Sequence, residues 1–241
     1  MFNNEQIGVS AEIAIADFFG VPVSMNYRAR GVSVVVESIK PIISGVFLQE
    51  MVPRPVLHVA ERQNPIDFGL ENNKTLSVKT NKQKLGKAAS QIIGQASSIT
   101  WFNLLANSLG IANIPVSYDE RVLLFKTIIL ARIDELLSIY WQYMFDCDYL
   151  IHIFNIVDRN ENLTYNPKYV VFKKTRTPIW DASKISFTKS TVLDWNESNT
   201  VKYNGVSIGE FQVHSNRDNF KFRFNMAGIT KLINEKSLKT L

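Results

Sequence analysis

Three short β-type segments follow one another between residues 56 and 80, and they constrain the fold more than any other part of the sequence. The segments span 56–60, 66–70 and 75–80, and the turn-like run Glu71-Asn72-Asn73-Lys74 separates the last two. Short runs rich in β-branched and aromatic residues, bounded by Pro and Asn, are typical of antiparallel strands. This part of the chain therefore predicts a three-stranded meander.

Helices and further strands are predicted on both sides of this meander. Residues 10–19 form an amphipathic pattern that begins at a potential N-cap, Ser10, and ends at Gly20. The pattern of residues 32–51 allows a helix or a strand followed by a helix. Helical periods recur over 84–109, with a break near Ser97, and over 119–145; strands are indicated at 149–154, 168–173, 185–188, 206–213 and 220–224, with a short closing helix at 228–233. We expect an α/β (α+β) fold, with a mixed central β-sheet flanked by helices.

Positive charge is concentrated in the C-terminal third of the chain. Residues 1–167 contain 14 Lys and Arg against 16 Asp and Glu, whereas residues 168–241 contain 13 against 6, so the net charges are −2 and +7. A basic region attracts a polyanion, because each neutralised phosphate releases counterions. We expect a core over 1–160 and a basic, β-rich DNA-recognition region over 161–241. A merely solvated basic surface is the alternative.

Composition narrows the cellular setting and the chemistry. The single cysteine, Cys147, excludes an intrachain disulfide framework and a cysteine-based zinc cluster. His58 and His152 lie in apolar strands and are interpreted as hydrogen-bonded core residues, and Cys147 as a core thiol. The sequence has neither a signal-peptide pattern nor an apolar run long enough for a membrane span, so we expect a soluble, cytoplasmic protein with no membrane partner.

The segment from Asn64 to Lys82 combines residue types that suit metal-dependent phosphodiester hydrolysis. That reaction needs oxygen ligands for a hard cation and a positive charge near the attacking water or the phosphate. Asp67 and Lys79 supply a carboxylate and an ammonium group. In an extended strand Thr75, Ser77, Lys79 and Asn81 share one face, and Leu76, Val78 and Thr80 share the other. The second strand therefore has a polar face over an apolar one.

The same segment resembles the PD-(D/E)xK nuclease signature, in which an aspartate precedes, across a turn, an acid-x-Lys on the next strand. Asn64-Pro65-Ile66-Asp67 carries the first part, with proline displaced by one place, and Ser77-Val78-Lys79 carries the second, with Ser77 in place of the acid. The resemblance implies Mg²⁺ bound by Asp67 and by the backbone carbonyl of Val78. It also implies that Lys79 orients or activates the attacking water.

The turn between the two strands decides whether these groups meet. A two-residue turn at Asn72-Asn73 sets Asp67 opposite Val78, on the face away from Lys79. A three-residue loop, Asn72-Asn73-Lys74, sets Asp67 opposite Lys79, and asparagine tolerates the positive φ that such a loop requires. The proposed site requires the three-residue loop. An ordinary exposed hairpin with a solvated lysine is the alternative.

Ser77 leaves the site one carboxylate short, and three glutamates are candidates to replace it. Glu12 ranks first, because many nucleases that the chain resembles direct a glutamate from the first core helix into the metal site. Glu61, just before the Asp67 strand, ranks second, and Glu71 belongs to the exposed turn. Each of them could instead be a surface carboxylate.

Two further segments are candidate DNA-binding surfaces. Lys82 is a candidate contact, and downstream of it the residues Lys84, Lys87, Gln91 and Gln95 would share one stripe of a predicted helix. Near the C-terminus a strand, a polar turn and a second strand would direct phenylalanines to one face and basic residues to the other. Arginine reads guanine and asparagine or glutamine reads adenine, so the candidate contacts are Gln212, His214, Asn216, Arg217, Lys221 and Arg223. Plain solvated surfaces are the alternative in both places.

The resemblance covers residues 8–95 and, more weakly, 205–233. It implies a type II restriction endonuclease that cuts double-stranded DNA, with a cognate DNA methyltransferase as a genetic rather than a physical partner. A homodimer would match a palindromic site by symmetry, whereas a monomer would cut the strands in turn. The alternatives are a repair or structure-selective nuclease of the same fold, a noncatalytic DNA-binding protein with a degenerate site, and, more remotely, a carbohydrate- or protein-binding β module.

Overall fold

The chain divides into two compact units. The computed structural model describes residues 2–61, 64–164, 166–214 and 217–238. The first unit comprises residues 1–86 and 145–174, and the second comprises 87–144 and 175–241. Each unit holds one five-stranded sheet, and seven α-helices lie in the described parts of the chain. The predicted mixed α/β class is confirmed. The functional boundary near residue 160 stays a prediction, since the two units interleave along the sequence.

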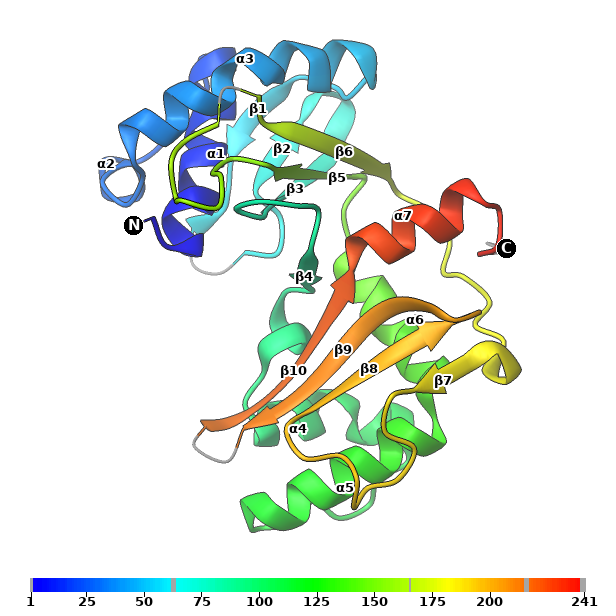
Figure 1. Cartoon of the computed structure of the whole chain (residues 1–241). Coiled ribbons are helices and arrows are strands. Elements are labelled where there is room, and N and C mark those ends of the chain that lie inside the picture. Colours follow the sequence, from blue (N-terminus) through cyan, green and yellow to red (C-terminus); the bar gives the residue numbers. More distant parts are fainter. Residues whose placement is uncertain (1, 62–63, 165, 215–216, 239–241) are drawn as a thin grey trace. The chain divides into compact units, whose positions relative to one another are not determined.

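The first unit is built on a mixed sheet with the strand order β1-β2-β3-β5-β6 (Figure 1). Its strands are β1 (Pro55–His58), β2 (Phe68–Leu70), β3 (Thr75–Thr80), β5 (Tyr149–Phe154) and β6 (Lys168–Lys173). The antiparallel pairs β1–β2 and β2–β3 confirm the predicted meander. Strand β5 then joins β3 in parallel, with Lys79 beside His152, which makes β3 an interior strand.

Helix α1 (Asn4–Phe19) begins six residues before the predicted start. Asn3 caps it: its side chain accepts from the Gln6 amide, and the Gln6 side chain accepts from the Asn3 amide. Ser10, predicted as the N-cap, is instead buried and accepts a hydrogen bond from the Val32 amide. The helix ends at Gly20, as predicted, where φ is 69°.

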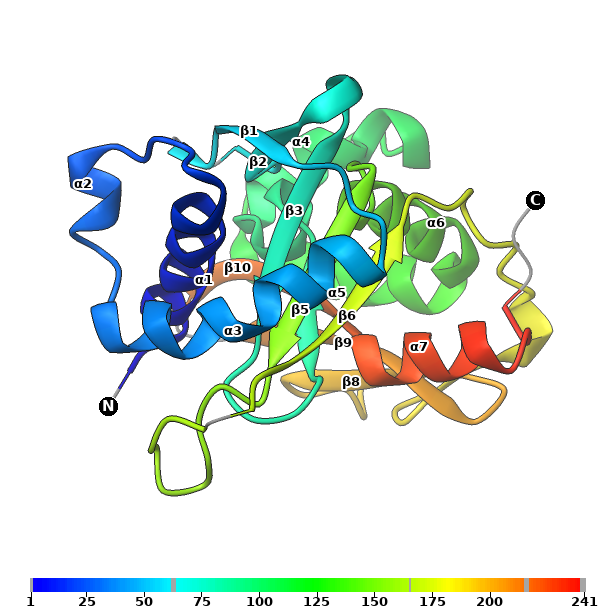
Figure 2. The ribbon, with the colours of Figure 1, turned by 90° about the horizontal axis from the view of Figure 1, so that it is seen from above.

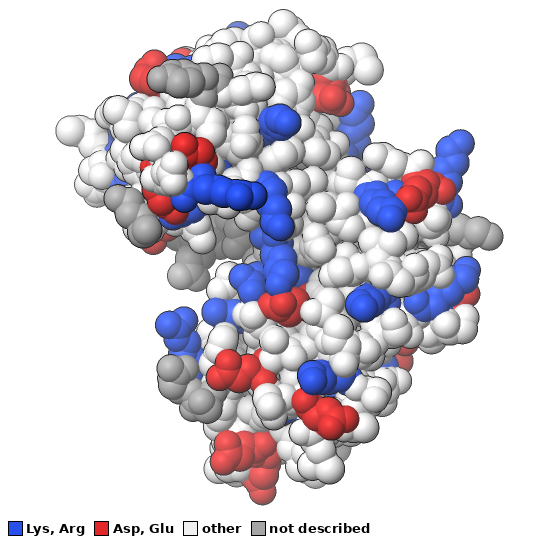
Figure 3. All heavy atoms as spheres, in the orientation of Figure 1, with Lys and Arg blue, Asp and Glu red and all other residues white. Residues whose placement is uncertain are grey.

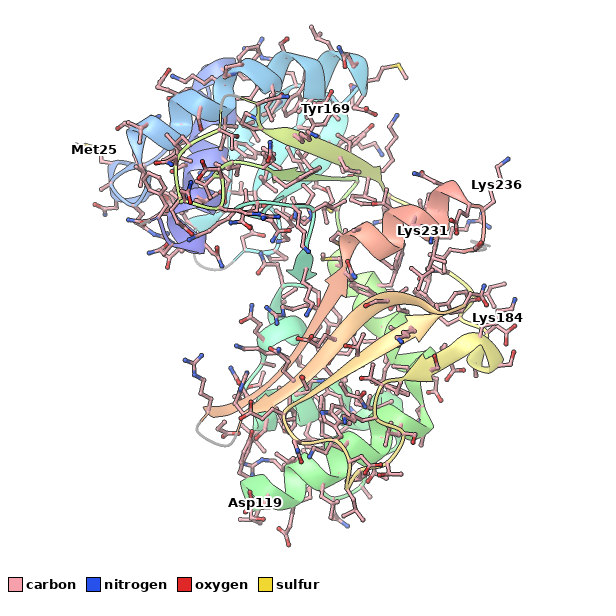
Figure 4. All side chains as sticks on the ribbon, in the orientation of Figure 1. Met25, Asp119, Tyr169, Lys184, Lys231 and Lys236 are labelled. Atoms are coloured by element: carbon pink, nitrogen blue, oxygen red, sulfur yellow. The ribbon has the colours of Figure 1, made fainter. Side chains whose placement is uncertain are left out.

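The open question at residues 32–51 resolves as one helix, α3 (Ser33–Gln49), after the short helix α2 (Met25–Arg28). Val35, Ile39, Ile43 and Val46 recur at helical spacing and are all buried, so packing outweighs the strand preference of the β-branched run. Helices α1 and α3 enclose the core of this unit together with Leu76 and Val78 of β3 (Figure 2). Tyr169 of β6, labelled in Figure 4, donates to Gln49 at the end of α3.

The second unit contains an antiparallel sheet with the strand order β4-β10-β9-β8-β7. Its strands are β4 (Lys87–Ala89), β7 (Ile185–Phe187), β8 (Ser198–Tyr203), β9 (Val206–His214) and β10 (Arg217–Asn225). Phe220, Phe222 and Phe224 are buried on one face, and Lys221 and Arg223 lie on the other, as predicted. The closing helix is α7 (Met226–Asn234), and β8 had no clear signal in the sequence.

Helices α4 (Ser98–Leu109), α5 (Tyr118–Ala131) and α6 (Ile133–Met144) cover the aromatic face of this sheet. Phe220 stacks on Phe125 of α5 with ring centroids 4.0 Å apart, and Phe222 lies 4.5 Å from Tyr140 of α6. The predicted single helix over 119–145 is therefore wrong. The chain breaks at Arg132, where φ is −134° and ψ is 39°, and the Arg132 guanidinium donates to the Leu109 carbonyl at the end of α4.

The helix predicted upstream of Ser97 is also wrong. Residues 87–89 form the edge strand β4, and Ile92–Gln95 form a 3₁₀ helix. The Gly86 amide donates to the Asn81 side chain, and β4 pairs with β10 through Lys87 and Asn225. These long-range partners outweigh a helical pattern of only a few apolar residues. Ser97 is the N-cap of α4, which agrees with the predicted break. No helix in the described parts of the chain is both long and apolar enough to cross a bilayer.

The aromatic core of the second unit yields a stability prediction. Replacing Phe222 with Ala removes a fully buried ring that contacts Tyr140, Phe211 and Phe224. We expect the free energy of unfolding to fall by about 3–5 kcal/mol, measured by urea denaturation. Phe18→Ala, at a side chain that is 46% exposed, is the control and should cost less than about 1 kcal/mol. Equal losses for the two variants would contradict this account of the core.

Candidate active site

Asp67 reaches β3 through a loop that differs by one residue from the prediction. The loop consists of Glu71, Asn72 and Asn73, and both asparagines have positive φ, at 60° and 57°. Phe68 pairs with Leu76, so the register sets residue 67 near Ser77 and not opposite Lys79. The predicted residue type and loop length are correct, but the predicted loop position is wrong.

Asp67 lies beside β3 and contacts it through both its backbone and its side chain. The Asp67 backbone amide donates to the carbonyl of Leu76, although the strand partner of Leu76 is Phe68, so the pairing of the two strands is locally irregular here. Its Oδ2 accepts from the Val78 amide at 2.6 Å and from the Ser77 hydroxyl at 3.1 Å. Asp67 is only 5% exposed. Ser77 therefore acts as a hydrogen-bond donor to the acid at the position where the resembling motif has a second acid.

Glu12 is the second carboxylate of this region. It lies in the interior of α1 and is 8% exposed. Its Oε2 lies 2.6 Å from the Tyr27 hydroxyl, which donates to it, and 3.0 Å from Nε2 of His58. One oxygen of this carboxylate is thus held by two other elements, α2 and β1.

Burial and mutual repulsion perturb these acids. Burial is the first cause that raises the pKa of Asp67 from 3.8 to about 7, and the nearby Glu12 carboxylate is the second. Lys79 and the hydrogen bonds from Val78 and Ser77 act in the opposite direction. Burial and Glu12 also raise the pKa of Tyr27 far above its usual value, so the phenol stays protonated and donates to Glu12. A carboxyl group that titrates near neutral pH beside a second acid is typical of functional sites.

Lys79 is half-buried on β3, two residues beyond Ser77. Burial and the Lys79 charge lower the pKa of His152 to about 4, so this neighbouring ring is neutral. Nε2 of His152 lies 2.7 Å from Oδ1 of Asn81, an oxygen that already accepts from the Gly86 amide. The imidazole therefore carries its proton on Nε2. Burial raises the pKa of Cys147 to about 12, in agreement with its interpretation as a core thiol.

The donor set fits a hard divalent cation. Asp67 and Glu12 each have one oxygen engaged, while Oδ1 of Asp67 and Oε1 of Glu12 accept no hydrogen bond from any residue that the structure describes. In a strand the amide and carbonyl of one residue point to the same edge, so the Val78 carbonyl lies on the Asp67 side of β3. Two carboxylates and a carbonyl suit Mg²⁺, which keeps several waters and takes phosphate oxygens as further ligands.

No group of three or more His, Cys, Asp or Glu side chains suitable for a metal occurs within the described ranges. A cation held by two carboxylates would therefore depend on water or substrate oxygens to complete its coordination. Glu61, the second-ranked acid, is exposed and lines a hollow of about 290 Å³ with Ser24, Asn26, Tyr27 and Arg30. Glu71 is exposed in the turn. Of the three candidate glutamates, Glu12 is the one that perturbs Asp67.

The first of the two predicted DNA-contacting surfaces does not form. The stripe of Lys84, Lys87, Gln91 and Gln95 does not exist, because residues 84–95 form a loop, a strand and a 3₁₀ helix. Lys82 lies beyond the end of β3 and forms an ion pair with Glu161 at 2.9 Å. Lys84 is exposed. These four residues and Lys82 remain candidates individually, without a common helical face.

The polar face of the second sheet does collect several predicted residues around Glu210. The Glu210 carboxylate lies 2.5 Å from the Lys87 ammonium, 3.2 Å from Nη2 of Arg223 and 2.5 Å from the Gln212 amide nitrogen. In Figure 3, basic side chains gather over β4 and the adjoining part of β10, with acidic side chains beside them. Burial, Arg217 and Arg223 lower the pKa of Lys221.

The remaining residues of the hairpin lie near its turn. His214 is the last residue of β9, where its carbonyl accepts from Tyr118, and Arg217 opens β10 and is exposed. Asn216 lies outside the described residues. The sequence did not predict three residues that contact the candidate site residues: Tyr27, His58 and Glu210. Glu210 had a signal, since it alternates with the buried residues of its strand, whereas nothing near Tyr27 in the sequence indicates its contact with Glu12.

Comparison with known proteins gives one informative match. The chain is 34% identical over 170 residues to the type II restriction enzyme CviAII of Paramecium bursaria Chlorella virus 1. The match covers 69% of this chain and 43% of that protein, so the chain spans less than half the length of its relative. No protein-family model matches the chain, and no solved structure matches it.

The Asp67–Glu12 pair predicts a specific dependence of stability on pH. Because the folded-state pKa of Asp67 is raised, the folded protein retains a proton that the unfolded chain releases, and stability falls as pH rises from about 4 to about 7. Asp67→Asn cannot ionise. In metal-free buffer we expect it to be more stable than the wild type above neutral pH, by roughly 1–3 kcal/mol, and to lose this advantage in acid.

Urea denaturation in EDTA across this pH range measures the difference. Glu37→Gln, on the exposed face of α3, is the control and should follow the wild type. An Asp67→Asn variant that is equally destabilised at every pH would show that the carboxyl group is not under electrostatic strain.

Proposed function

Since the chain is a homologue of a type II restriction enzyme, we propose that it is a Mg²⁺-dependent endonuclease that hydrolyses double-stranded DNA at a specific sequence. The observation that carries the proposal is the buried pair Asp67 and Glu12 beside Lys79, within a chain that has this relative. The pair provides oxygen donors for a hard cation, and the lysine provides the positive charge that phosphodiester hydrolysis needs. A PD-(D/E)xK type of site, with Ser77 at the second acidic position, accounts for this arrangement.

Each residue has a distinct role in the proposed mechanism. Asp67, Glu12 and the backbone carbonyl of Val78 would hold Mg²⁺. When bound, Mg²⁺ supplies positive charge at a phosphate oxygen and lowers the pKa of a water molecule. Lys79 orients the attacking water or neutralises charge on the phosphate. Ser77 donates to Oδ2 of Asp67, which leaves Oδ1 available as a ligand.

The polar face of the second sheet is the proposed DNA-recognition surface. Its candidate contacts are Lys87, Gln212, Lys221 and Arg223, with Arg217 and His214 near the turn. Arg223 and Gln212 have the hydrogen-bonding groups that read base edges, whereas Lys87 and Lys221 suit phosphates. Glu210 holds three of these side chains and limits the net positive charge of the face. Cutting at a defined sequence requires both kinds of contact.

Active-site variants test the hydrolysis. We expect Asp67→Ala, Lys79→Ala and Glu12→Gln each to reduce Mg²⁺-dependent cleavage of plasmid and phage DNA by about 100-fold or more. Binding of duplex DNA in Ca²⁺, measured by fluorescence anisotropy, should remain within about threefold of the wild type for Glu12→Gln, because the variant conserves shape. Glu37→Gln should cleave like the wild type.

Two results would change the assignment. Full cleavage by Asp67→Ala would overturn the proposed centre. Salt-dependent DNA binding by a wild-type protein that cuts no substrate in Mg²⁺ would favour a noncatalytic DNA-binding protein, in which Ser77 marks a degenerate site. Cutting at mismatches or junctions in place of a short duplex sequence would indicate a repair or structure-selective nuclease.

Charge variants test the recognition surface. Lys221→Ala should weaken binding to all duplex sequences and reduce the slope of log affinity against log salt by about 1. The matched controls are Lys184→Ala and Lys231→Ala, at side chains labelled in Figure 4 that form local pairs with Asp181 and Glu235. The controls should leave the slope unchanged. An equal effect of Lys184 and Lys221 would mean that overall charge, and not this face, attracts DNA.

A further inference from the structure

The contacts of Glu12 go beyond what a metal ligand needs for itself. Glu12 is the only residue of the candidate centre contributed by α1, and two separate elements hold the same oxygen atom of its side chain. The Tyr27 hydroxyl of α2 is 2.6 Å from Oε2, and Nε2 of His58 at the end of β1 is 3.0 Å from it. Both contacts are long-range, at sequence separations of 15 and 46 residues. Oε1 accepts from no residue in the described part of the chain.

Tyr27 and His58 are themselves fixed in position. The Tyr27 amide donates to the Ser24 hydroxyl at 3.2 Å, and the Arg30 guanidinium lies 5.0 Å from the Tyr27 ring centroid. The His58 ring packs edge-on against Tyr27, with centroids 4.6 Å apart, and against Phe68, at 5.1 Å. Phe68 follows Asp67 directly, so His58 connects the Glu12 carboxylate to the strand that begins directly after the other acid.

These two hydrogen bonds fix the orientation of the Glu12 carboxylate. With Oε2 engaged twice, rotation of the Glu12 side chain would break two buried hydrogen bonds, and each buried group left without a partner costs about 1–3 kcal/mol. The side chain therefore presents Oε1 in one direction before any cation arrives. Asp67 repeats this arrangement, because the Val78 amide and the Ser77 hydroxyl engage its Oδ2. Preorganised ligands of this kind bind a metal more tightly, and their outer partners contribute to the affinity.

We infer that Tyr27 and His58 are positioning residues that orient Glu12 for the metal of the proposed nuclease centre. This inference rests on the proposed function. It assigns to this chain a hydrogen-bonded support, formed by α2 and β1, for the glutamate that stands in for the missing acid at position 77. The motif acid would have come from β3 itself, next to Asp67, whereas a glutamate from a separate helix needs its own anchors to reach the same metal.

Mn²⁺ binding to the DNA-free protein tests the inference without depending on cleavage. The concentration of free Mn²⁺, read from its electron paramagnetic resonance signal, gives the affinity. We expect Tyr27→Phe and His58→Leu each to weaken Mn²⁺ binding by about 10-fold, with Glu12→Gln at least as severe. His58→Gln retains an N–H donor and should restore affinity to within about threefold of the wild type.

The controls separate positioning from general structural damage. Tyr169→Phe removes a tyrosine hydroxyl from the same unit, where it contacts Gln49, and should bind Mn²⁺ like the wild type. Tyr27→Phe deletes a single oxygen atom, and far-UV circular dichroism checks that the variants fold. The ratio of His58→Gln to His58→Leu affinity is a readout that a merely space-filling role would not alter.

The possible failures are distinguishable. If Glu12→Gln loses Mn²⁺ while Tyr27→Phe and His58→Leu bind it normally, the positioning role is wrong and the metal centre stands. If the wild type and Glu12→Gln bind Mn²⁺ equally, the proposed centre is wrong and the inference falls with it. Parallel loss in Tyr27→Phe and His58→Leu, with recovery in His58→Gln, supports the inference.

Discussion

The hydrogen bond from the Val78 amide to Asp67 is the contact on which the candidate site depends. It joins Asp67, the residue before β2, to Val78 of β3 at 2.6 Å, and the Ser77 hydroxyl donates to the same carboxylate oxygen. A buried carboxylate beside a second acid is unfavourable, because both burial and like charge oppose ionisation. The two donors and the positive charge of Lys79 partly offset this cost. The remainder is electrostatic strain that a divalent cation would relieve.

The presence of serine at position 77, where the resembling motif has an acid, has a physical explanation. An acid at position 77 would add a further negative charge to a buried region that already contains Asp67 and Glu12. Serine instead donates a hydrogen bond to Asp67, and Glu12 provides the second carboxylate from α1. In our proposal the second acid of the motif therefore comes from α1 and not from β3. The consequence is a dependence on Tyr27 and His58, which a strand-borne acid would not need.

In our proposal the second unit uses the two faces of one sheet for different purposes, stability and DNA recognition. One face is packed with aromatic rings, including Phe220, Phe222 and Phe224, against α4, α5 and α6. The alternation of side chains along β9 and β10 directs Glu210, Gln212, Lys221 and Arg223 to the other face. The aromatic core can thus hold the strands in place without using the side chains of the polar face. Glu210 limits how strongly its basic neighbours can bind anions without regard to sequence, because it already occupies their donors.

Local sequence determined the features that depend on neighbouring residues alone. The meander over 56–80, strands such as β5 and β6, the end of α1 at Gly20 and the two faces of β10 follow from alternation, turn residues and caps, which act over a few positions. The placement of Lys79 near enough to Asp67 to lower the pKa of its carboxyl was also indicated, since the motif fixes residue types and approximate spacing.

The tertiary structure decided what long-range partners control. The pairing of β4 with β10 overrode the helical pattern at 84–95, and packing against the sheet divided the predicted helix over 119–145 at Arg132. The one-residue shift of the loop to Glu71–Asn73 set the register of Asp67. Glu12, Tyr27 and His58 come from three elements whose side chains meet only after the chain is folded, and no local pattern encodes a contact across 46 residues. The sequence therefore determined which groups were available, and the packing of separate elements decided which of them meet.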